Sequence, residues 1–130
     1  MSVNNAKRLL GLGLGVLLLF HGVDKLLNGI DGIIEMVNGL NLPYEKYTQY
    51  LAYGVYLGEV IAPVLLILGR YVRMAGFLIV INMLVAMVLT HTGTIFSLAE
   101  HGAWVIELPM LYLIMGLTLA VWGKEKIKKQ

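Results

Sequence analysis

The stretch LGEVIAPVLLILGRYVRMAGFLIVINMLVAMVLT, residues 57–90, decides the fold of this chain. It contains two apolar runs that are separated only by a short segment carrying Arg70 and Arg73. A helix needs roughly 20 mostly apolar residues to cross a bilayer. The first run reaches that length when the residues before Leu57 are included, and the second reaches it by itself. Two helices with so short a connection form an antiparallel hairpin. The stretch therefore predicts two membrane spans, over residues 48–69 and 71–90.

Two further apolar runs flank this hairpin, at residues 7–27 and 103–123. The first follows Lys7 and Arg8 as in a signal peptide, but the small-residue cleavage pattern is missing, so we expect an uncleaved span. The 130 residues are 58% hydrophobic and only 14% charged, with a mean hydropathy of +0.78. A soluble domain of this size could not bury so much apolar surface. We therefore expect an all-α fold, a single membrane domain built as a four-transmembrane-helix bundle.

The segment between the first two spans has a helical periodicity of its own. Its apolar residues recur every three or four positions, and its polar residues fall on the other side. The apolar set is Ile30, Ile33, Ile34, Val37 and Leu40. This pattern is typical of a short amphipathic helix lying in the membrane interface. A packed re-entrant lid with no ligand role is the alternative.

Basic residues are distributed unevenly over the two sides of the predicted bundle. With the N-terminus inside, the inner side holds Lys7, Arg8, Arg70, Arg73, Lys124, Lys126, Lys128 and Lys129. The outer side holds only Lys25 and Lys46. Because Lys and Arg accumulate in cytoplasmic loops, we expect both termini in the cytoplasm.

Polar side chains inside the spans are the candidate functional residues, because a charge at mid-membrane costs about 2.5–3.5 kcal/mol. They are His21 and Lys25 in the first span, Glu59 in the second, Asn82 and His91 in the third, and Glu107 in the fourth. A rise of about 1.5 Å per residue places them all in the middle or outer half of the bilayer. If the faces that carry them converge, they form one buried polar site that is open toward the outside, and Tyr56 could face it.

A purely structural interpretation of these residues stays open. Glu59 with Lys25, or Glu107 with His21, could form buried ion pairs that only fix the register of the helices. Asn82 could be a hydrogen-bonding contact between helices.

Prolines and glycines modify the predicted helices. Pro63 frees the carbonyl of Glu59 and Pro109 that of Val105, so we expect kinks close to both glutamates. Small residues let helices approach closely: Gly11, Gly15 and Gly22 share one stripe of the first span, and Gly54 and Gly58 form a GxxxG pair. We expect these glycines to pack inside the bundle. A dimer face, which would make the protein a homo-oligomer, is the alternative.

Several motifs resemble those of the DoxX family. FHGVDKL at residues 20–26 resembles the family's "hG-x-x-Kl" end of the first span, and GLNLP at residues 39–43 resembles its "GLGLP". Gly58-Glu59 with the following hairpin resembles "E…lLllG…tR". The resemblance covers nearly the whole chain and implies a multi-pass, four-helix protein of the bacterial or archaeal cytoplasmic (inner) membrane. The motif positions that it carries over are His21, Lys25, Glu59, Arg73 and Glu107.

Members of that family have been tied to terminal quinol oxidase, to thiosulfate:quinone oxidation and to membrane-associated oxidoreductase complexes. The resemblance therefore favours a redox-linked subunit or accessory, not itself assigned a reaction, whose polar site binds quinone or relays protons beside an oxidoreductase partner. One alternative is a permease or binder of lipid or other small molecules. Another is a membrane anchor or assembly partner for a soluble enzyme, docked on the basic tail Lys124–Lys129. A haem between His21 and His91 is the least favoured cofactor.

Composition excludes other classes. The chain has no cysteine, which rules out thiol–disulfide chemistry and iron–sulfur ligation by its own residues. The net charge of +2 is too small to indicate binding to nucleic acid. We also expect no metal site.

Overall fold

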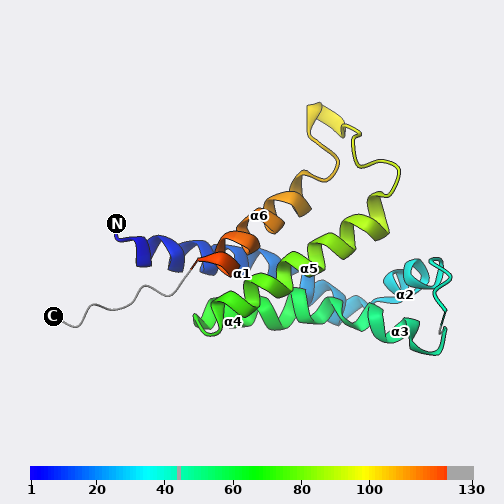
Figure 1. The fold of residues 1–130 in the computed structure, drawn as a ribbon, viewed down its shortest axis with the longest axis horizontal. Coiled ribbons are helices and arrows are strands. Elements are labelled where there is room, and N and C mark those ends of the chain that lie inside the picture. The colour runs from blue at the N-terminus through cyan, green and yellow to red at the C-terminus, as the bar shows by residue number, and fades with distance from the viewer. Residues whose placement is uncertain (44, 123–130) are drawn as a thin grey trace.

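The computed structural model describes residues 1–43 and 45–122, which form a helical fold (Figure 1). In chain order the elements are α1 (Val3–Asn28), α2 (Asp31–Asn38), α3 (Glu45–Tyr53), the π-helix η1 (Leu57–Ile61), α4 (Ala62–Leu68), α5 (Val72–His91), the 3₁₀-helix η2 (Glu100–Gly102) and α6 (Glu107–Val121). Within the described residues the β pairing is one isolated bridge, between Leu98 and Trp104. The predicted all-α class is therefore confirmed for this part of the chain.

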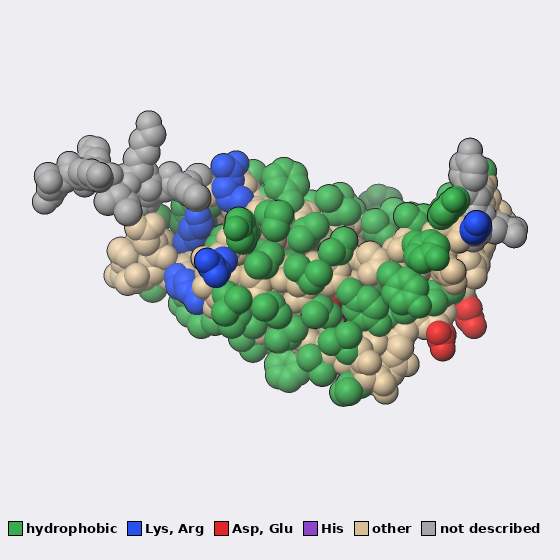
Figure 2. All heavy atoms as spheres, turned by 90° about the horizontal axis from the view of Figure 1, so that it is seen from below, with side chains coloured by type: hydrophobic (Ala, Val, Ile, Leu, Met, Phe, Trp, Pro, Cys, Tyr) green, Lys and Arg blue, Asp and Glu red, His purple; other side chains and the backbone are tan. Residues whose placement is uncertain are grey.

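In the described part of the chain, three helical stretches are long and apolar enough to cross a membrane: Val3–Asn28, Lys46–Leu68 and Val72–His91. They coincide to within a few residues at each end with three of the predicted spans. Only 28–33% of each apolar window is buried inside the protein, so the remaining surface is available to lipid. Figure 2 shows apolar side chains covering the length of the molecule between its charged ends.

The fourth predicted span differs from the structure at its start. α6 begins at Glu107 rather than near residue 103, and its 15 residues measure about 22 Å, shorter than a hydrocarbon core of roughly 30 Å. Pro109 explains the late start. It lies in the first turn of α6, where a missing N–H leaves no helical hydrogen bond unmade. The predicted kink at Pro109 is therefore wrong, because the helix begins there instead.

Two close helix pairs form the core. α1 packs against η1 and α4, and α5 packs against α6 (Figure 1). Glycines set both separations: a Cβ on Gly15 would lie 2.8 Å from the Pro63 carbonyl oxygen, and one on Gly76 would lie 2.5 Å from that of Gly116. The fully buried side chains of the core are apolar, among them Leu14, Leu66, Ile79 and Leu119. The prediction that the first-span glycines pack inside the bundle is confirmed.

Basic side chains cap helix C-termini at one end of the bundle. The Nη1 of Arg8 donates to the Leu66 carbonyl at the end of α4 (2.6 Å), and the Nε of Arg73 donates to the Ala120 carbonyl near the end of α6 (3.1 Å). Cations stabilise the negative end of a helix dipole. We call this the basic end; Figure 2 shows Lys and Arg gathered there and acidic residues at the opposite end. The tail Lys124–Lys129 lies outside the described residues.

α2 and α3 together cover the opposite end of the bundle, and we call this pair the lid. α2 lies where the amphipathic segment predicted a helix, and its apolar face turns inward. Ile30 and Val37 are buried together with Ala52 of α3, and Leu89 of α5 packs against them. Leu40 is exposed and takes no part in this face. A helix between the first two spans is therefore present, and its location in a membrane interface stays a prediction.

Candidate functional site

Glu59 lies in η1, a π-helical turn inside the second span. Such a turn closes hydrogen bonds five residues apart, and the N–H of Ala62 accordingly donates to the Leu57 carbonyl. Pro63 follows at once and cannot supply the N–H that a regular helix would give to the Glu59 carbonyl. The irregularity predicted next to Glu59 is present as a π-turn. Turns of this kind are frequent at functional sites.

The freed carbonyl of Glu59 faces α1 at Gly22. A Cβ built on Gly22 would overlap this carbonyl oxygen, so no other residue type fits without moving one of the two helices. Backbone contacts of the Cα–H···O kind are common where helices approach this closely. Lys25 lies almost one turn further along α1. Gly22 therefore brings α1 near enough for Lys25 to reach the Glu59 side chain.

The Glu59 carboxylate receives one hydrogen bond on each oxygen, from two different helices. The Lys25 Nζ lies 2.5 Å from Oε2, forming an ion pair, and the Asn82 Nδ2 of α5 donates to Oε1 at 3.1 Å. Gly58 makes room for the second bond, because a Cβ there would overlap the Asn82 side chain. Glu59 itself is only 6% exposed. We call Lys25, Glu59 and Asn82 the polar site.

Lys25 connects the buried carboxylate to the surface. Its side chain is 21% exposed, against 9% for the side chain of Glu59. Among the described side chains, no buried nitrogen or oxygen lacks a hydrogen-bond partner, so the site is satisfied as it stands. A carboxylate held by a partly exposed ammonium group can exchange protons with the outside through that group. The arrangement can therefore act as a register-fixing ion pair, as a proton relay, or as a pair of donors for a ligand carbonyl.

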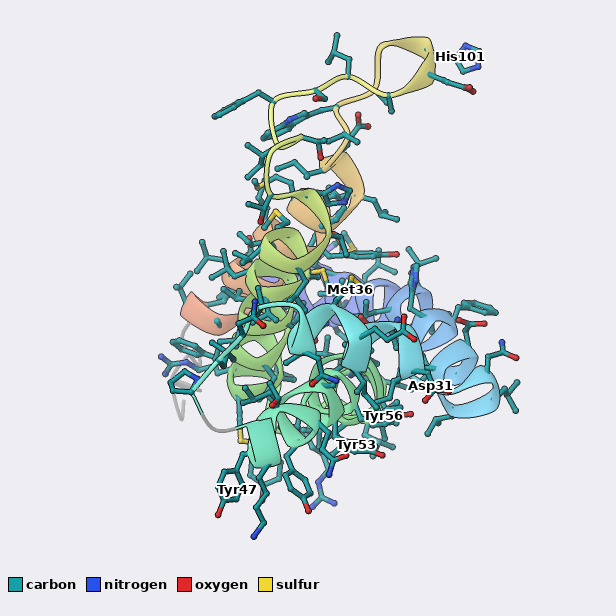
Figure 3. All side chains as sticks on the ribbon, turned by 90° about the vertical axis from the view of Figure 1, so that its right-hand side faces the viewer. Asp31, Met36, Tyr47, Tyr53, Tyr56 and His101 are labelled. Carbon is teal, nitrogen blue, oxygen red and sulfur yellow. The ribbon has the colours of Figure 1, made fainter. Side chains whose placement is uncertain are left out.

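Two tyrosines and His21 surround the polar site. The Tyr56 hydroxyl donates to the Lys25 carbonyl at 3.2 Å, and Figure 3 shows Tyr56 beside Tyr53 at the lid. Tyr112 of α6 is buried and within electrostatic range of the Glu59 carboxylate. The exposed His21 ring meets Tyr112 edge-on, with 6.0 Å between ring centroids.

The other two predicted site residues have different surroundings. Glu107 is exposed at the start of α6, where its Oε2 accepts from the Trp104 N–H at 3.2 Å. His91 is half-buried at the end of α5, and its carbonyl accepts from the Thr94 N–H. The structure thus brings three of the six predicted residues into direct contact and leaves His21 at their edge through Tyr112.

Two neighbours of the site were not predicted from the sequence. Tyr112 could have been noticed as a hydroxyl within an apolar run of the fourth span. Gly58 was read only as part of a GxxxG pair, whereas its direct neighbour is Asn82. Both follow from the helix pairing, which a single sequence does not specify.

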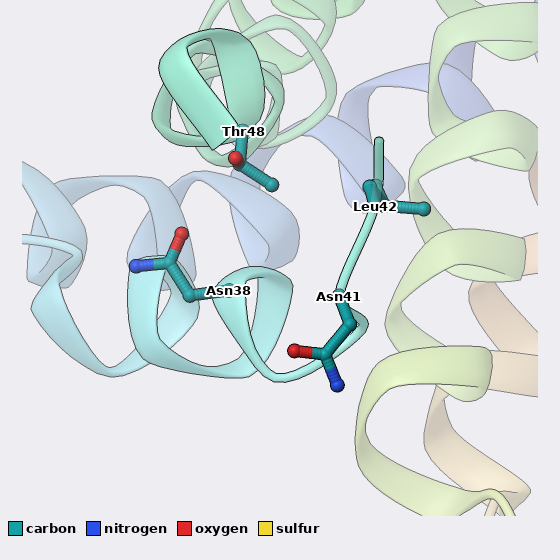
Figure 4. A pocket seen from close by; sticks show the side chains of 4 residues that line it. All are labelled: Asn38, Asn41, Leu42 and Thr48. Carbon is teal, nitrogen blue, oxygen red and sulfur yellow. The ribbon is translucent and has the colours of Figure 1, made fainter. Parts of the chain in front are cut away.

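Two cavities lie away from the polar site, and neither is lined by Lys25, Glu59 or Asn82. One, of about 390 Å³, lies at the lid and is lined by Asn38, Asn41, Leu42 and Thr48 (Figure 4). The other lies at the basic end. Among the described residues, no three His, Asp or Glu side chains come together as a metal site would require. His101 lies at the tip of the loop that projects beyond α5 and α6 (Figure 3).

Comparison with known proteins gives one match, to the family model described as DoxX, over residues 7–92. The matched region runs from α1 to the end of α5. It includes the whole polar site and ends before Glu107. Neither the curated proteins nor the solved structures contain a match.

Proposed function

Because the chain belongs to the DoxX family of membrane proteins, we propose that it is a redox-linked membrane subunit whose polar site binds a quinone head group or relays protons to one. The observation that carries the proposal is the buried Glu59 carboxylate, held by Lys25 and Asn82 from two other helices. A charged group at this depth is costly and marks a functional site by default in membrane proteins.

The chemistry of the site suits a quinone. Its carbonyl oxygens accept hydrogen bonds and take up protons on reduction. Lys25 and Asn82 are N–H donors, and the Lys25 ammonium can pass a proton to the Glu59 carboxylate across their 2.5 Å contact. His21 is exposed on α1 and is therefore open to a ligand dissolved in the bilayer. A quinone would approach laterally and exchange its hydrogen bonds with those that now close the site.

Gentle purification followed by quinone extraction tests the proposal. We expect mass spectrometry to find quinone with the wild-type protein and none with the Glu59→Gln variant, which keeps the size of the side chain and removes its charge. Lys46→Gln, which removes an exposed cation of α3, is the matched control and should retain quinone. Absence of quinone from the wild-type protein in several mild detergents would contradict the proposal.

A binder of small polar molecules is the second candidate, and the lid cavity favours it. Among the described residues that line it, Asn38, Asn41 and Thr48 carry hydrogen-bonding side chains. Under this alternative, Asn38→Leu should abolish uptake or binding of a solute in liposomes while quinone content is unchanged. The redox proposal predicts the reverse pattern for Glu59→Gln.

The membrane arrangement that we propose has four spans, α2 in the interface, and both termini on the cytoplasmic side of a bacterial inner membrane. Lys7 supports the common side of the termini, since its Nζ donates to the Trp122 carbonyl just beyond α6 (3.2 Å). The absence of cysteine gives a clean labelling test. With a membrane-impermeant maleimide on intact cells, Ser97→Cys should react, whereas Ser2→Cys and Gln130→Cys should react only after permeabilisation. Reaction of the Gln130→Cys variant in intact cells would show that α6 does not cross.

A further inference from the structure

A second site, separate from the polar site, lies at the basic end. A cavity of about 650 Å³ opens there between the first turns of α1 and the turn that joins α4 to α5. Its lining includes the cations Lys7, Arg8, Arg70 and Arg73, together with apolar side chains such as Leu66 and Val72. The family motifs account for Arg73 alone among these four, and the function proposed above uses none of them.

The positive charge of the three arginines is not neutralised within the described residues. Arg8 donates to the carbonyls of Leu66 (2.6 Å) and Ile67 (2.5 Å), and Arg73 to that of Ala120. Carbonyls satisfy hydrogen bonds but carry no net charge. None of the described residues that line the cavity is acidic. The cavity therefore has the electrostatics of an anion site, and guanidinium groups match the geometry of phosphate oxygens.

The surface around the cavity is apolar and exposed. Leu9, Leu68 and Met74 are 60%, 62% and 50% exposed respectively. Leu9 and Met74 each directly follow an arginine in the chain, and Leu68 lies two residues before Arg70. Figure 2 shows the cationic side chains with apolar side chains directly beside them. Free phosphate would not contact this surface, whereas the acyl chains of a lipid would continue along it. Basic pockets between membrane helices bind anionic head groups in this way.

We propose that the cavity at the basic end binds the phosphate head group of one anionic phospholipid, with Arg8, Arg70 and Arg73 around the phosphate and the acyl chains along Leu68 and Met74. The lipid would bridge α1 to the α4–α5 turn, which directly follows the last turn of α4 that Arg8 already joins to α1. Its binding therefore also stabilises the first helix pair.

Titration of the purified full chain with phosphatidylglycerol, followed by native mass spectrometry, tests this proposal. Each basic residue near a membrane surface contributes about fivefold to binding of anionic lipid. Arg70→Gln should therefore weaken phosphatidylglycerol binding about fivefold, and Arg70→Gln with Arg73→Gln about 25-fold. Lys46→Gln, which removes a cation at the lid end, should leave the affinity unchanged. Phosphatidylcholine should bind much more weakly, and millimolar inorganic phosphate should not displace phosphatidylglycerol.

The variants also separate binding from folding. Arg73 holds α6 through Ala120, so loss of binding in the double variant counts only when its circular dichroism matches the wild type. Arg70 lies exposed in the α4–α5 turn, and the single variant therefore gives the decisive comparison. Wild-type affinity in a folded Arg70→Gln protein, or an equal loss in the Lys46→Gln protein, would overturn the proposal. Displacement by inorganic phosphate would assign the site to free phosphate instead.

Discussion

Replacement of Lys25 by Met tests whether the ion pair with Glu59 holds α1 against η1 and α4. The change keeps most of the apolar stem and removes the ammonium group that lies 2.5 Å from Oε2. Glu59 is 6% exposed, so the carboxylate would be left in the bundle with the amide of Asn82 as its hydrogen-bond donor. Breaking a buried pair costs roughly 3–5 kcal/mol. Because Lys25 itself is one-fifth exposed, we expect about 3 kcal/mol, the lower end of that range.

The partner variant completes a double-mutant cycle. Glu59→Gln can still accept from Lys25 or Asn82, and the remaining ammonium group can turn to solvent, so we expect a loss of about 1–2 kcal/mol. The double variant contains no buried charge and should lose about 2 kcal/mol, less than the sum of the single losses. The coupling free energy is then about 2–3 kcal/mol.

Unfolding in mixed detergent micelles, followed by the far-ultraviolet circular dichroism signal, measures these free energies. Helices that persist in the unfolded state reduce such values, so all four proteins must be compared under one condition. Additive losses, with a coupling free energy below about 0.5 kcal/mol, would refute the reasoning. Additive losses would mean that Lys25 and Glu59 contribute independently to the free energy of unfolding.

Further predictions concern the surroundings of the pair. Gly22→Ala should destabilise the protein by about 1–3 kcal/mol, because its Cβ overlaps the Glu59 carbonyl oxygen. Gly13→Ala, with no neighbour within 4 Å, should be neutral or slightly stabilising in the same unfolding assay, and equal losses would contradict the assigned packing. Asn82→Leu should cost about 1–3 kcal/mol by removing the donor to Oε1, and an unchanged midpoint would argue against that bond. Glu107→Gln should leave quinone content unchanged, since the carboxylate bonds to the Trp104 N–H.

Much of the polar site could be predicted from the free-energy cost of placing polar side chains inside a membrane. Glu59, Lys25 and Asn82 stand out because polar groups are rare in apolar helices, and a common depth indicated that they meet. His91 and Glu107 are also polar residues at this depth, but in the structure they bond to Thr94 and Trp104 respectively and not to the polar site. Depth fixes position along a helix, whereas contact also requires that the residue faces the right neighbour. That rotation is set by packing between helices.

The sequence by itself determined the apolar helices, the hairpin at Arg70–Arg73 and the uneven charge at the two ends, since each follows from local composition and the thickness of a bilayer. The tertiary structure alone decided which helices pair. That pairing placed Gly22 against the Glu59 carbonyl and Gly58 against Asn82. It also gave basic residues a second role, as caps on the C-termini of α4 and α6. The physical reason is that lipid accepts any apolar face equally, so only close contact between small residues selects a partner helix.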